Sequence, residues 1–563
     1  MSYRLHFILS SALVMGLTAC SSGKGSDVTY EGESCYTGGP IYTAIDSAPT
    51  VEAVRVKDGV IRYAGAATDN WCDSGEMINL AGSAMYPGFT DAHGHFVGIG
   101  LREMTLNLEG TLSIAELKTR VSAAIKDLPA GETLYGRGWI ETHWPEKRFP
   151  NRLDLDEIAP DNPVILERAD GHALVVNSAA LKAANITADT EIPFGGDVLK
   201  DDAGNPTGML IDKADALVRD LMPTITEPRI RTAMKKASDL YASRGWTNIH
   251  SMSFDPAGIS LVQEEANAGN VKIRVYASTD IGGGFETSEF AANPDRNNLI
   301  TRRSIKLYAD GALGSRGAAL LAPYEDDPEN IGLMLTTYDT IMPVLKSALK
   351  DGVQVNTHAI GDKANRLVLD WYEEAMDAVP ASERAIAEPR WRIEHSQIIA
   401  LEDIPRFAKL GVIPSMQPSH AIGDLHFAVD RLGPERLAGG YAWRSLIDSG
   451  SIIAGGSDAP VEVGDTRIEF YAAVARKDLK GYSNQNWNDG EKVTRQEALK
   501  MFTIWPAYAA FEDDRLGTIE AGKSADFTVF DRDIMTIAET EILDVKTVMT
   551  IVNGAVVYSA KAN

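Results

Sequence analysis

Short apolar runs of strand length recur through the middle of the chain, with helical patterns between several of them. The eight runs are residues 86–95, 245–252, 272–278, 304–311, 353–360, 391–397, 411–418 and 451–460. In stretches such as 225–244 and 340–352, apolar residues recur at steps of three and four, the period of an amphipathic helix. Strands that alternate with helices are typical of a parallel sheet. Eight of them predict an α/β fold, the (β/α)8 TIM barrel.

The two ends of the chain have a different pattern, in which apolar and polar residues alternate between short turns. Residues 51–65 contain two such runs joined by a Lys-Asp-Gly turn at 57–59, and a second hairpin signal stands at Asn553-Gly554. We therefore expect the two ends to meet in one small β-sandwich domain.

These patterns predict the domain organisation. The expected parts are a signal peptide at 1–20, a linker at 21–35, the β-sandwich domain at 36–84 and 515–563, and the barrel at 85–514. The first two barrel strands are separated by far more than one helix. Residues 105–225 between them are predicted to be an insertion near the barrel mouth, where the loops after barrel strands are elaborated.

The first twenty residues have the pattern of an export signal. Arg4 gives a positive start, residues 7–17 are apolar but too short to span a bilayer, and the segment LTAC ends at Cys20. This ending resembles the lipobox of bacterial lipoproteins, which implies an exported protein that is held to the membrane only by a lipid anchor on Cys20. Ser21 favours the periplasmic face of the outer membrane. A plain cleaved signal with a coincidental cysteine is the alternative.

Composition limits the partners of the protein. The hydrophobic share of 44% is typical of a globular chain, and the formal net charge of −25 repels polyphosphate, which excludes nucleic acid as a partner. A small-molecule substrate is expected, and the oligomeric state stays open. In an oxidising compartment Cys35 and Cys72 can pair, although two free thiols are equally compatible with the sequence.

Metal-type side chains lie at the C-terminal ends of the predicted barrel strands, where barrel function gathers. They are His93 and His95 on the first strand, His358 on the fifth, His395 on the sixth and Asp458 on the eighth. Any one of these histidines is more simply a hydrogen-bonded core residue. Together, on four strands, they predict a site for one or two divalent metal ions, most simply zinc. Water at an open coordination position would there become a hydroxide nucleophile near pH 7.

Lys306 is a further candidate ligand, because it stands between Ile305 and Leu307 in the fourth run. A lysine inside an apolar strand is costly unless it is paired, and burial lowers its pKa. A neutral amine reacts with carbon dioxide to give a carbamate, an anion able to bridge two metal ions. The alternative is an ion pair with a nearby carboxylate such as Asp310.

Several motifs carry a resemblance to a known family. PGFTDAHGHF is similar to the first metal motif of the amidohydrolase superfamily. IKLYADGALGSRGA, NTHAIGDKAN, RIEHSQ, SMQPSH and GSDAPV resemble the amidohydro-3 branch, the YtcJ-like metal-dependent hydrolases related to N-substituted formamide deformylase. The resemblance extends from about residue 40 to residue 560 and includes both chain ends.

The resemblance implies a role for each matched residue. The implied ligands are His93, His95 and Asp458 for one ion, His358 and His395 for a second, and carboxylated Lys306 as the bridge. Asp458 would also be catalytic, moving a proton from the attacking water to the leaving nitrogen. The implied substrate contacts are Trp139, His172, Arg316 and Gln417, with His172 also catalytic and with packing as the alternative for each. His250 and His420 are candidate partners of the ligands.

The implied activity is hydrolysis of a non-peptide C–N bond in an amide, a formamide or a cyclic amide. Deamination, or ester or lactone hydrolysis, is the alternative within this fold. A non-catalytic surface lipoprotein that binds a ligand or metal is the alternative from another class. Two departures from the branch, Asp212 where glutamate is usual and Ala459 where a bulky aromatic is frequent, leave the substrate open.

Overall fold

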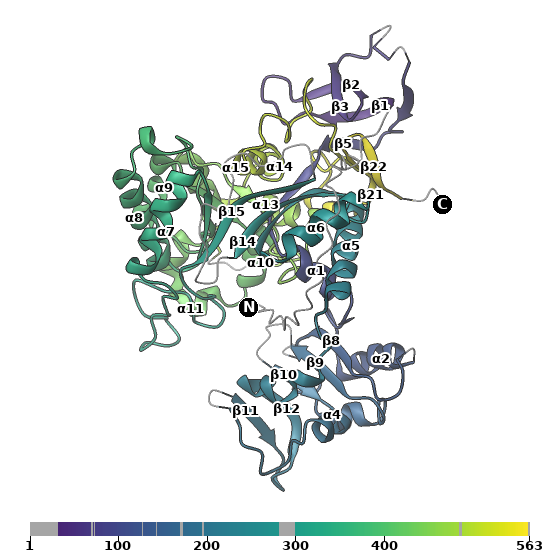
Figure 1. The fold of residues 1–563 in the computed structure, drawn as a ribbon, viewed down its shortest axis with the longest axis vertical. Coiled ribbons are helices and arrows are strands. Elements are labelled where there is room, and N and C mark those ends of the chain that lie inside the picture. Colours follow the sequence, from purple (N-terminus) through teal and green to yellow (C-terminus); the bar gives the residue numbers. More distant parts are fainter. Residues whose placement is uncertain are drawn as a thin grey trace, which may run out of the picture. The chain divides into compact units, whose positions relative to one another are not determined.

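The computed structural model describes residues 32–68, 71–72, 74–126, 128–141, 144–168, 173–193, 196–280, 299–483 and 487–560. The chain divides into two compact units, Met1–Phe96 with Ser238–Asn563 and Val97–Ala237. Figure 1 labels the elements of each. The predicted signal peptide, Cys20 and His172 lie outside the described residues. None of the described helices is long and apolar enough to cross a bilayer.

Eight parallel strands form the barrel of the first unit. They are β6 (Phe89–Gly94), β13 (Trp246–Phe254), β14 (Arg274–Asp280), β15 (Ile300–Tyr308), β16 (Gln354–Ala359), β17 (Arg392–His395), β18 (Ile413–Met416) and β19 (Ala454–Gly455). Each strand pairs with the next one along the chain. Two backbone hydrogen bonds join the ends of this sheet, because Asp458 N–H donates to the His93 carbonyl at 2.5 Å and His95 N–H donates to the Ala459 carbonyl at 2.7 Å. The predicted barrel is confirmed, and each predicted run overlaps one strand.

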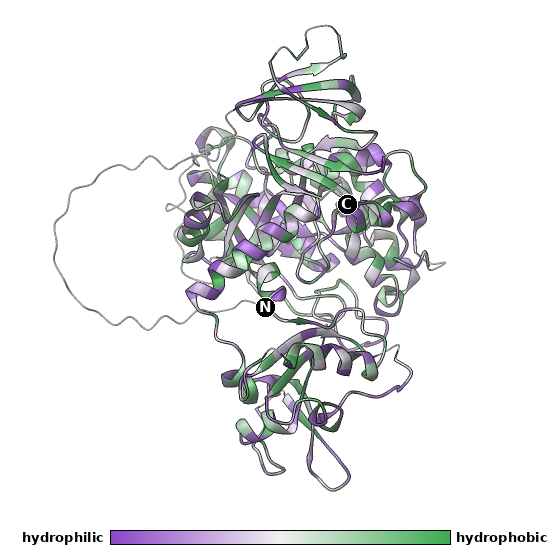
Figure 2. Ribbon diagram, turned by 90° about the vertical axis from the view of Figure 1, so that its right-hand side faces the viewer, coloured by the Kyte–Doolittle hydropathy of each residue, from purple (hydrophilic) through white to green (hydrophobic). Residues whose placement is uncertain are grey.

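Helices follow most barrel strands. The first unit contains α6 (Gly258–Asn267), α7 (Tyr338–Asp351), α8 (Asp362–Ala378), α9 (Ile404–Leu410), α10 (Pro418–Asp424), α11 (Ala428–Arg436), α12 (Trp443–Asp448), α13 (Thr466–Ala475), α14 (Arg495–Met501) and α15 (Ile504–Ala509), while α5 (Glu227–Ser243) leads into β13. Short 3-10 turns are η3 (Ala381–Glu383), η4 (Leu401–Asp403), η5 (Leu437–Gly439), η6 (Asp489–Glu491) and η7 (Glu539–Asp544). In α7 the buried residues Ile341, Leu345 and Leu349 recur every four positions. Figure 2 shows polar and apolar residues mixed along these helices, as expected where one face packs on a barrel.

Both chain ends join in one eight-stranded sheet. Its strands are β1 (Glu33–Tyr42), β2 (Thr50–Lys57), β3 (Val60–Gly65), β4 (Glu76–Asn79), β5 (Ala84–Pro87), β20 (Phe527–Phe530), β21 (Thr547–Val552) and β22 (Ala555–Ser559). The antiparallel pair of β5 and β20 connects the N-terminal strands to the C-terminal ones. Both predicted hairpins are present, and their turn residues Asp58, Gly59, Asn553 and Gly554 all have positive φ. Two successive positive φ values are the mark of the tight turn that fits a twisted hairpin.

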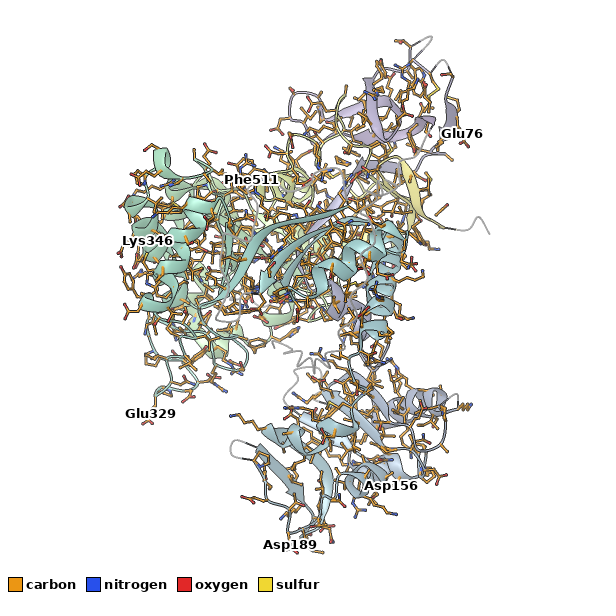
Figure 3. All side chains as sticks on the ribbon, viewed as in Figure 1. Glu76, Asp156, Asp189, Glu329, Lys346 and Phe511 are labelled. Atoms are coloured by element: carbon orange, nitrogen blue, oxygen red, sulfur yellow. A yellow bond between two sulfur atoms is a disulfide. The ribbon has the colours of Figure 1, made fainter. Side chains whose placement is uncertain are left out.

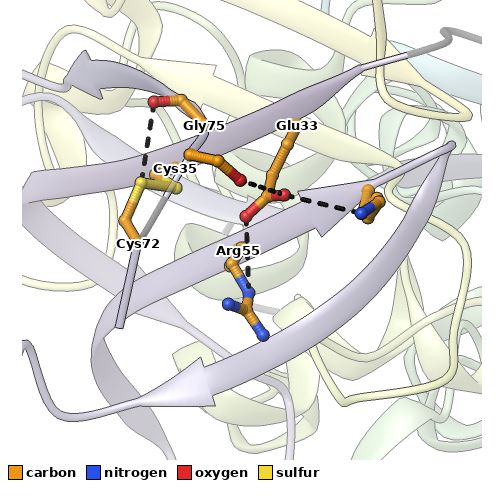
Figure 4. The surroundings of a disulfide bond; sticks show 7 residues. Glu33, Cys35, Arg55, Cys72 and Gly75 are labelled. Atoms are coloured by element: carbon orange, nitrogen blue, oxygen red, sulfur yellow. Dashed lines mark hydrogen bonds and ion pairs between the residues drawn. A yellow bond between two sulfur atoms is a disulfide. The ribbon is translucent and has the colours of Figure 1, made fainter. Parts of the chain in front are cut away.

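A disulfide joins Cys35 of β1 to Cys72 (Figure 4). Cys35 is fully buried. Beside the bond, the hydroxyl of Ser74 donates to Glu33 at 3.0 Å, and Arg55 of β2 lies 3.9 Å from the same carboxylate. The sequence left this pairing open, because it does not contain the distance between the two thiols.

The second unit contains a six-stranded sheet in the order β11-β12-β10-β9-β8-β7. Its elements are α1 (Phe96–Arg102), β7 (Leu106–Asn107), α2 (Ile114–Ile125), β8 (Leu134–Trp139), α3 (Arg152–Asp156), β9 (Val164–Arg168), β10 (Ala173–Val176), α4 (Ser178–Ala183), β11 (Gly196–Lys200), β12 (Pro206–Asp212) and η1 (Lys213–Leu221). Successive residues of β9 belong to two different apolar cores, Leu166 to one and Ile165 to the other, so both faces are covered. The unit is wider than the predicted 105–225. Its place near the barrel mouth stays a prediction.

Acidic side chains project from the surface of both units. Glu76, Asp189 and Glu329 are exposed and point outward in Figure 3. They belong to the excess of carboxylates that gives the chain its net charge of −25.

Candidate metal centre

The C-terminal ends of the barrel strands bring the metal-type side chains together. The ring centroids of His93 and His395 are 4.7 Å apart, and those of His358 and His395 are 4.5 Å apart. His395 and Asp458 have φ values of 74° and 61°. Left-handed backbone is uncommon for residues with a Cβ and is found preferentially at functional sites.

Three of these side chains form a compact set of donors. One ring nitrogen of His93, one of His395 and one oxygen of Asp458 lie within 4.8 Å of one another, and all three residues are buried. His358 Nε2 is buried and has no hydrogen-bond partner among the described residues. Imidazole nitrogens around a carboxylate suit a divalent ion such as zinc, so the residues present fit the expected metal. His395, which the resemblance assigns to a second ion, belongs here to the same set as His93 and Asp458.

Three histidines are oriented through their Nδ1 atoms. The contacts are His93 Nδ1 to Glu394 Oε2 at 2.5 Å, His95 Nδ1 to the Met252 carbonyl at 3.0 Å and His395 Nδ1 to Gln417 Oε1 at 2.8 Å. Because each of these oxygens accepts, Nδ1 carries the proton and Nε2 keeps its lone pair. Nε2 of His93 and of His95 lie 3.5 and 2.8 Å from Asp458 Oδ1. This is the arrangement that prepares histidine for a metal.

Burial and neighbouring charges set the protonation of the group. Burial holds the pKa of His93 and of His395 well below the usual value and lowers the pKa of His358 to about 3. Burial would raise the pKa of Asp458, but His93 and His95 hold it well below its usual range. Neutral imidazoles beside an ionised carboxylate are the forms that bind metal.

Lys306 lies beside the donors on β15. Its side chain is buried, and Nζ is 3.4 Å from His93 Nε2. Burial lowers the pKa of Lys306 to about 8. No ion pair joins Lys306 to Asp310 in the described part of the chain. The Asp310 carboxylate instead accepts from the backbone N–H groups of Ala319, Ile360 and Gly361 at 2.8 to 2.9 Å.

The other candidates have varied surroundings. Gln417 contacts His395 through its amide oxygen. Trp139 is fully buried in a core of the second unit, and its indole N–H donates to the Leu166 carbonyl at 2.9 Å, which is a packing role. The guanidinium of Arg316 is exposed and bound to Asp326. The parts of Trp139, Arg316 and Gln417 in substrate binding stay predictions.

The two remaining histidines lie inside the barrel and at its mouth. His420 Nε2 is 3.6 Å from Asp458 Oδ2 and 3.8 Å from Glu462 Oε1. His250 is fully buried, and its Nδ1 is 3.0 Å from Arg392 Nη1.

Two further residues of the site, Arg392 and Glu394, were not among the candidates predicted from the sequence. Glu394 contacts the donor His93, and Arg392 contacts Glu394. Both precede His395 in the motif RIEHSQ and alternate along β17, so they share one face of a buried strand. Two charged residues on the same face of a buried strand could have identified them as candidates, because buried charges need partners.

A parallel barrel with histidine and aspartate donors at its strand ends is typical of metal-dependent hydrolases. The chain belongs to the amidohydrolase family, because the model of that family (Amidohydro_3) matches residues 76–558.

Two relatives and one solved structure support this assignment. The chain is 33% identical over 539 residues to the putative amidohydrolase YtcJ of Bacillus subtilis (strain 168), covering 93% of this chain and 99% of the relative. It is 27% identical over 527 residues to N-substituted formamide deformylase of Arthrobacter pascens, covering 90% and 95%. An uncharacterized metal-dependent hydrolase from Pyrococcus horikoshii OT3 aligns with a TM-score of 0.73 and 26% identity, over 90% of this chain and 99% of that one. The branch predicted from the motifs is confirmed.

Proposed function

We propose that the protein hydrolyses a non-peptide C–N bond in an amide, a formamide or a cyclic amide. The observation that carries this proposal is the buried Asp458 carboxylate, whose Oδ1 lies 2.8 Å from His95 Nε2 and 3.5 Å from His93 Nε2. A carboxylate in that place takes a proton from attacking water and passes it to a leaving nitrogen. The similarity to the N-substituted formamide deformylase of Arthrobacter pascens supports this type of bond.

In this proposal the barrel residues hold one or two divalent ions, with zinc the favoured metal. The proposed ligands are His93, His95, His358, His395, Asp458 and carboxylated Lys306. When bound, the metal would polarise the scissile carbonyl and lower the pKa of water toward neutrality. Fixed Nδ1 contacts let the imidazoles meet the ion without reorganising.

Carboxylation of Lys306 is part of the proposal. Its support is the buried position of Nζ, 3.4 Å from His93 Nε2, together with the lowered pKa of the amine. The lone pair of neutral Nζ attacks the carbon of carbon dioxide, an N–C bond forms as one C=O π pair moves onto oxygen, and Nζ loses a proton to water, which leaves an anionic carbamate. The carbamate would bring a negative charge to a cluster of neutral imidazoles.

The experiment is a substrate panel with purified protein lacking residues 1–20. N-formyl amines, N-acyl amides, cyclic amides, amino-substituted heterocycles, esters and lactones are tested with and without zinc. We expect zinc-dependent release of amine from the first three classes. Ammonia release would favour the deaminase, faster ester or lactone cleavage would favour that hydrolase, and zinc binding with no turnover would favour a binding protein. Asp189→Asn, a change to an exposed carboxylate of the second unit, is the matched control for Asp458→Asn.

We further propose that the protein is exported and anchored through Cys20. The Cys35–Cys72 disulfide supports export, because such bonds persist in oxidising compartments. Mass spectrometry of the mature protein is expected to show a lipid-modified N-terminal Cys20, and Cys20→Ser is expected to move the protein from the membrane fraction to the soluble periplasm. An unmodified mature terminus elsewhere would overturn the anchor.

A further inference from the structure

Behind His93 lie three titratable side chains that the proposed reaction does not use. Arg392, Glu394 and His250 are each fully buried. Glu394 Oε2 accepts from His93 Nδ1 at 2.5 Å. Arg392 Nη2 donates to Glu394 Oε2 at 3.0 Å, and Arg392 Nε lies 2.7 Å from Oε1, so the two side chains form a close ion pair with one hydrogen bond.

The guanidinium of Arg392 is fixed by three other barrel strands. Nη2 donates to the Ala92 carbonyl of β6 at 2.6 Å and to Ser415 Oγ of β18 at 2.7 Å. Nη1 lies 3.0 Å from His250 Nδ1 of β13. Burial and the charge of Arg392 hold the pKa of His250 well below its usual value, so this imidazole is neutral and accepts. Because Arg392 is fixed in this way, the Glu394 carboxylate that it binds cannot turn away from His93.

Stability alone does not explain this buried charge pair. Replacing a buried ion pair by apolar side chains of similar volume is often neutral or stabilising, because desolvation offsets the Coulomb attraction. What the pair provides is a full negative charge at one nitrogen of one ligand. Of the three Nδ1 contacts described above, those of His95 and His395 are to a carbonyl and an amide oxygen, and that of His93 is to a carboxylate. Outer partners of this kind orient a ligand and raise its basicity.

We propose that Glu394 is the positioning residue of His93. Its carboxylate fixes the proton on Nδ1, aims Nε2 at the metal site and strengthens Nε2 as a donor, while Arg392 holds that carboxylate in place. This inference rests on the proposed metal-dependent hydrolysis. It further predicts that His93 is the strongest metal ligand among the imidazoles.

Two double variants test it, both with Arg392 replaced by methionine. R392M/E394Q keeps an acceptor for His93 but loses the charge, and R392M/E394L loses both. Zinc affinity is measured by competition with a chromophoric chelator, and the melting temperature of the metal-free protein reports the fold. We expect metal-free melting temperatures within a few degrees of each other, and zinc affinity about 10-fold weaker for R392M/E394Q and about 100-fold weaker for R392M/E394L than for wild type.

Two results with the double variants overturn the proposal. Wild-type affinity in both double variants means that Glu394 has no part in binding, and equal weakening means that Arg392 alone carries the effect. If a double variant does not fold, Glu394→Gln is compared with Asp526→Asn, which breaks a buried Arg–Asp pair elsewhere in the barrel. Equal zinc affinities in that comparison also overturn it. Wild-type zinc binding without turnover of any C–N substrate rejects the proposed function and leaves this inference intact.

Discussion

Near the two ends of the barrel, the described residues include a buried arginine–carboxylate pair at each, and these two pairs have different surroundings. Arg392 and Glu394 lie at the C-terminal end, where Glu394 contacts His93. Arg274 begins β14 at the N-terminal end, and its Nε is 2.6 Å from Asp526 of the C-terminal segment. Both pairs are almost completely enclosed, and Arg274 binds Asp526 through two hydrogen bonds, whereas Arg392 makes one to Glu394.

The two pairs differ in the residues that their carboxylates contact besides the arginine. Asp526 accepts the backbone N–H of Asn553 at 2.8 Å, and Arg274 donates to the Asn553 side chain, so this pair joins the barrel to the hairpin of β21 and β22. Glu394 instead contacts Nδ1 of His93, whose other ring nitrogen, Nε2, keeps a lone pair that can bind a metal ion. The same interaction therefore connects two parts of the fold at one end and prepares a ligand at the other.

The largest effect is expected at the metal end. Asp458→Asn removes the proposed proton acceptor and the negative ligand, so kcat/KM for the best C–N substrate should fall at least about 1,000-fold. The metal-free melting temperature should not fall, because the substitution removes a buried charge. Steady-state kinetics and thermal melting check both parts. Activity within 10-fold of wild type, with Asp189→Asn unchanged beside it, would remove Asp458 from the mechanism.

At the opposite end the expected effect is on stability. Asp526→Asn leaves the Arg274 charge buried without its counter-charge, and breaking a buried pair typically costs about 3–5 kcal/mol. Zinc affinity and the activity of the folded fraction should remain as in wild type. Chemical denaturation followed by tryptophan fluorescence, with zinc titration of the same sample, measures both. A loss of zinc affinity as large as in Glu394→Gln would erase the distinction between the two ends.

The two ends also differed in how far the sequence predicts them. The eight strands follow from local periodicity, and a parallel barrel necessarily collects strand-end residues such as His358 and His395 at one mouth. The contact between His93 and Glu394 spans 301 positions, so no local pattern contains it. The same limit applies to the Cys35–Cys72 bond and to the packing of Trp139, which depend on distances created only by folding.

A smaller loss of stability is expected from the terminal sheet. Removing the disulfide with Cys35→Ser and Cys72→Ser frees a loop of 37 residues in the unfolded chain, which typically costs about 2–4 kcal/mol. The bond lies in the sheet that Asp526 also holds, so metal affinity should not change. Melting curves of the oxidised, reduced and double-serine proteins check this. Equal melting temperatures of the reduced and oxidised proteins would show that the strand pairing of β1 stabilises this region without the disulfide.

The smallest effect is expected for a third pair of the same chemistry that is only partly enclosed. Arg444 Nη1 lies 2.8 Å from Glu497, whose other oxygen accepts the N–H and hydroxyl of Thr494 at the start of α14. Arg444 leads the contacts that lower the pKa of Glu497 from 4.5 to about 2. A lowered carboxyl pKa stabilises the fold above pH 4.5 and loses that contribution as the pH falls toward 2.

Because solvent screens this pair, Arg444→Leu should cost less than about 1 kcal/mol at pH 7. The variant should differ less from wild type at pH 3 than at pH 7, since at pH 3 the Glu497 carboxyl of the unfolded chain is largely protonated and must lose that proton on folding. Urea unfolding at the two pH values measures the difference, with Lys350→Leu, a change to an exposed cation of α7, as the control. If Arg444→Leu lowered the free energy of unfolding as much as Asp526→Asn does, burial would not explain the difference among the three pairs. The contrast between the two barrel ends would then need a cause other than burial.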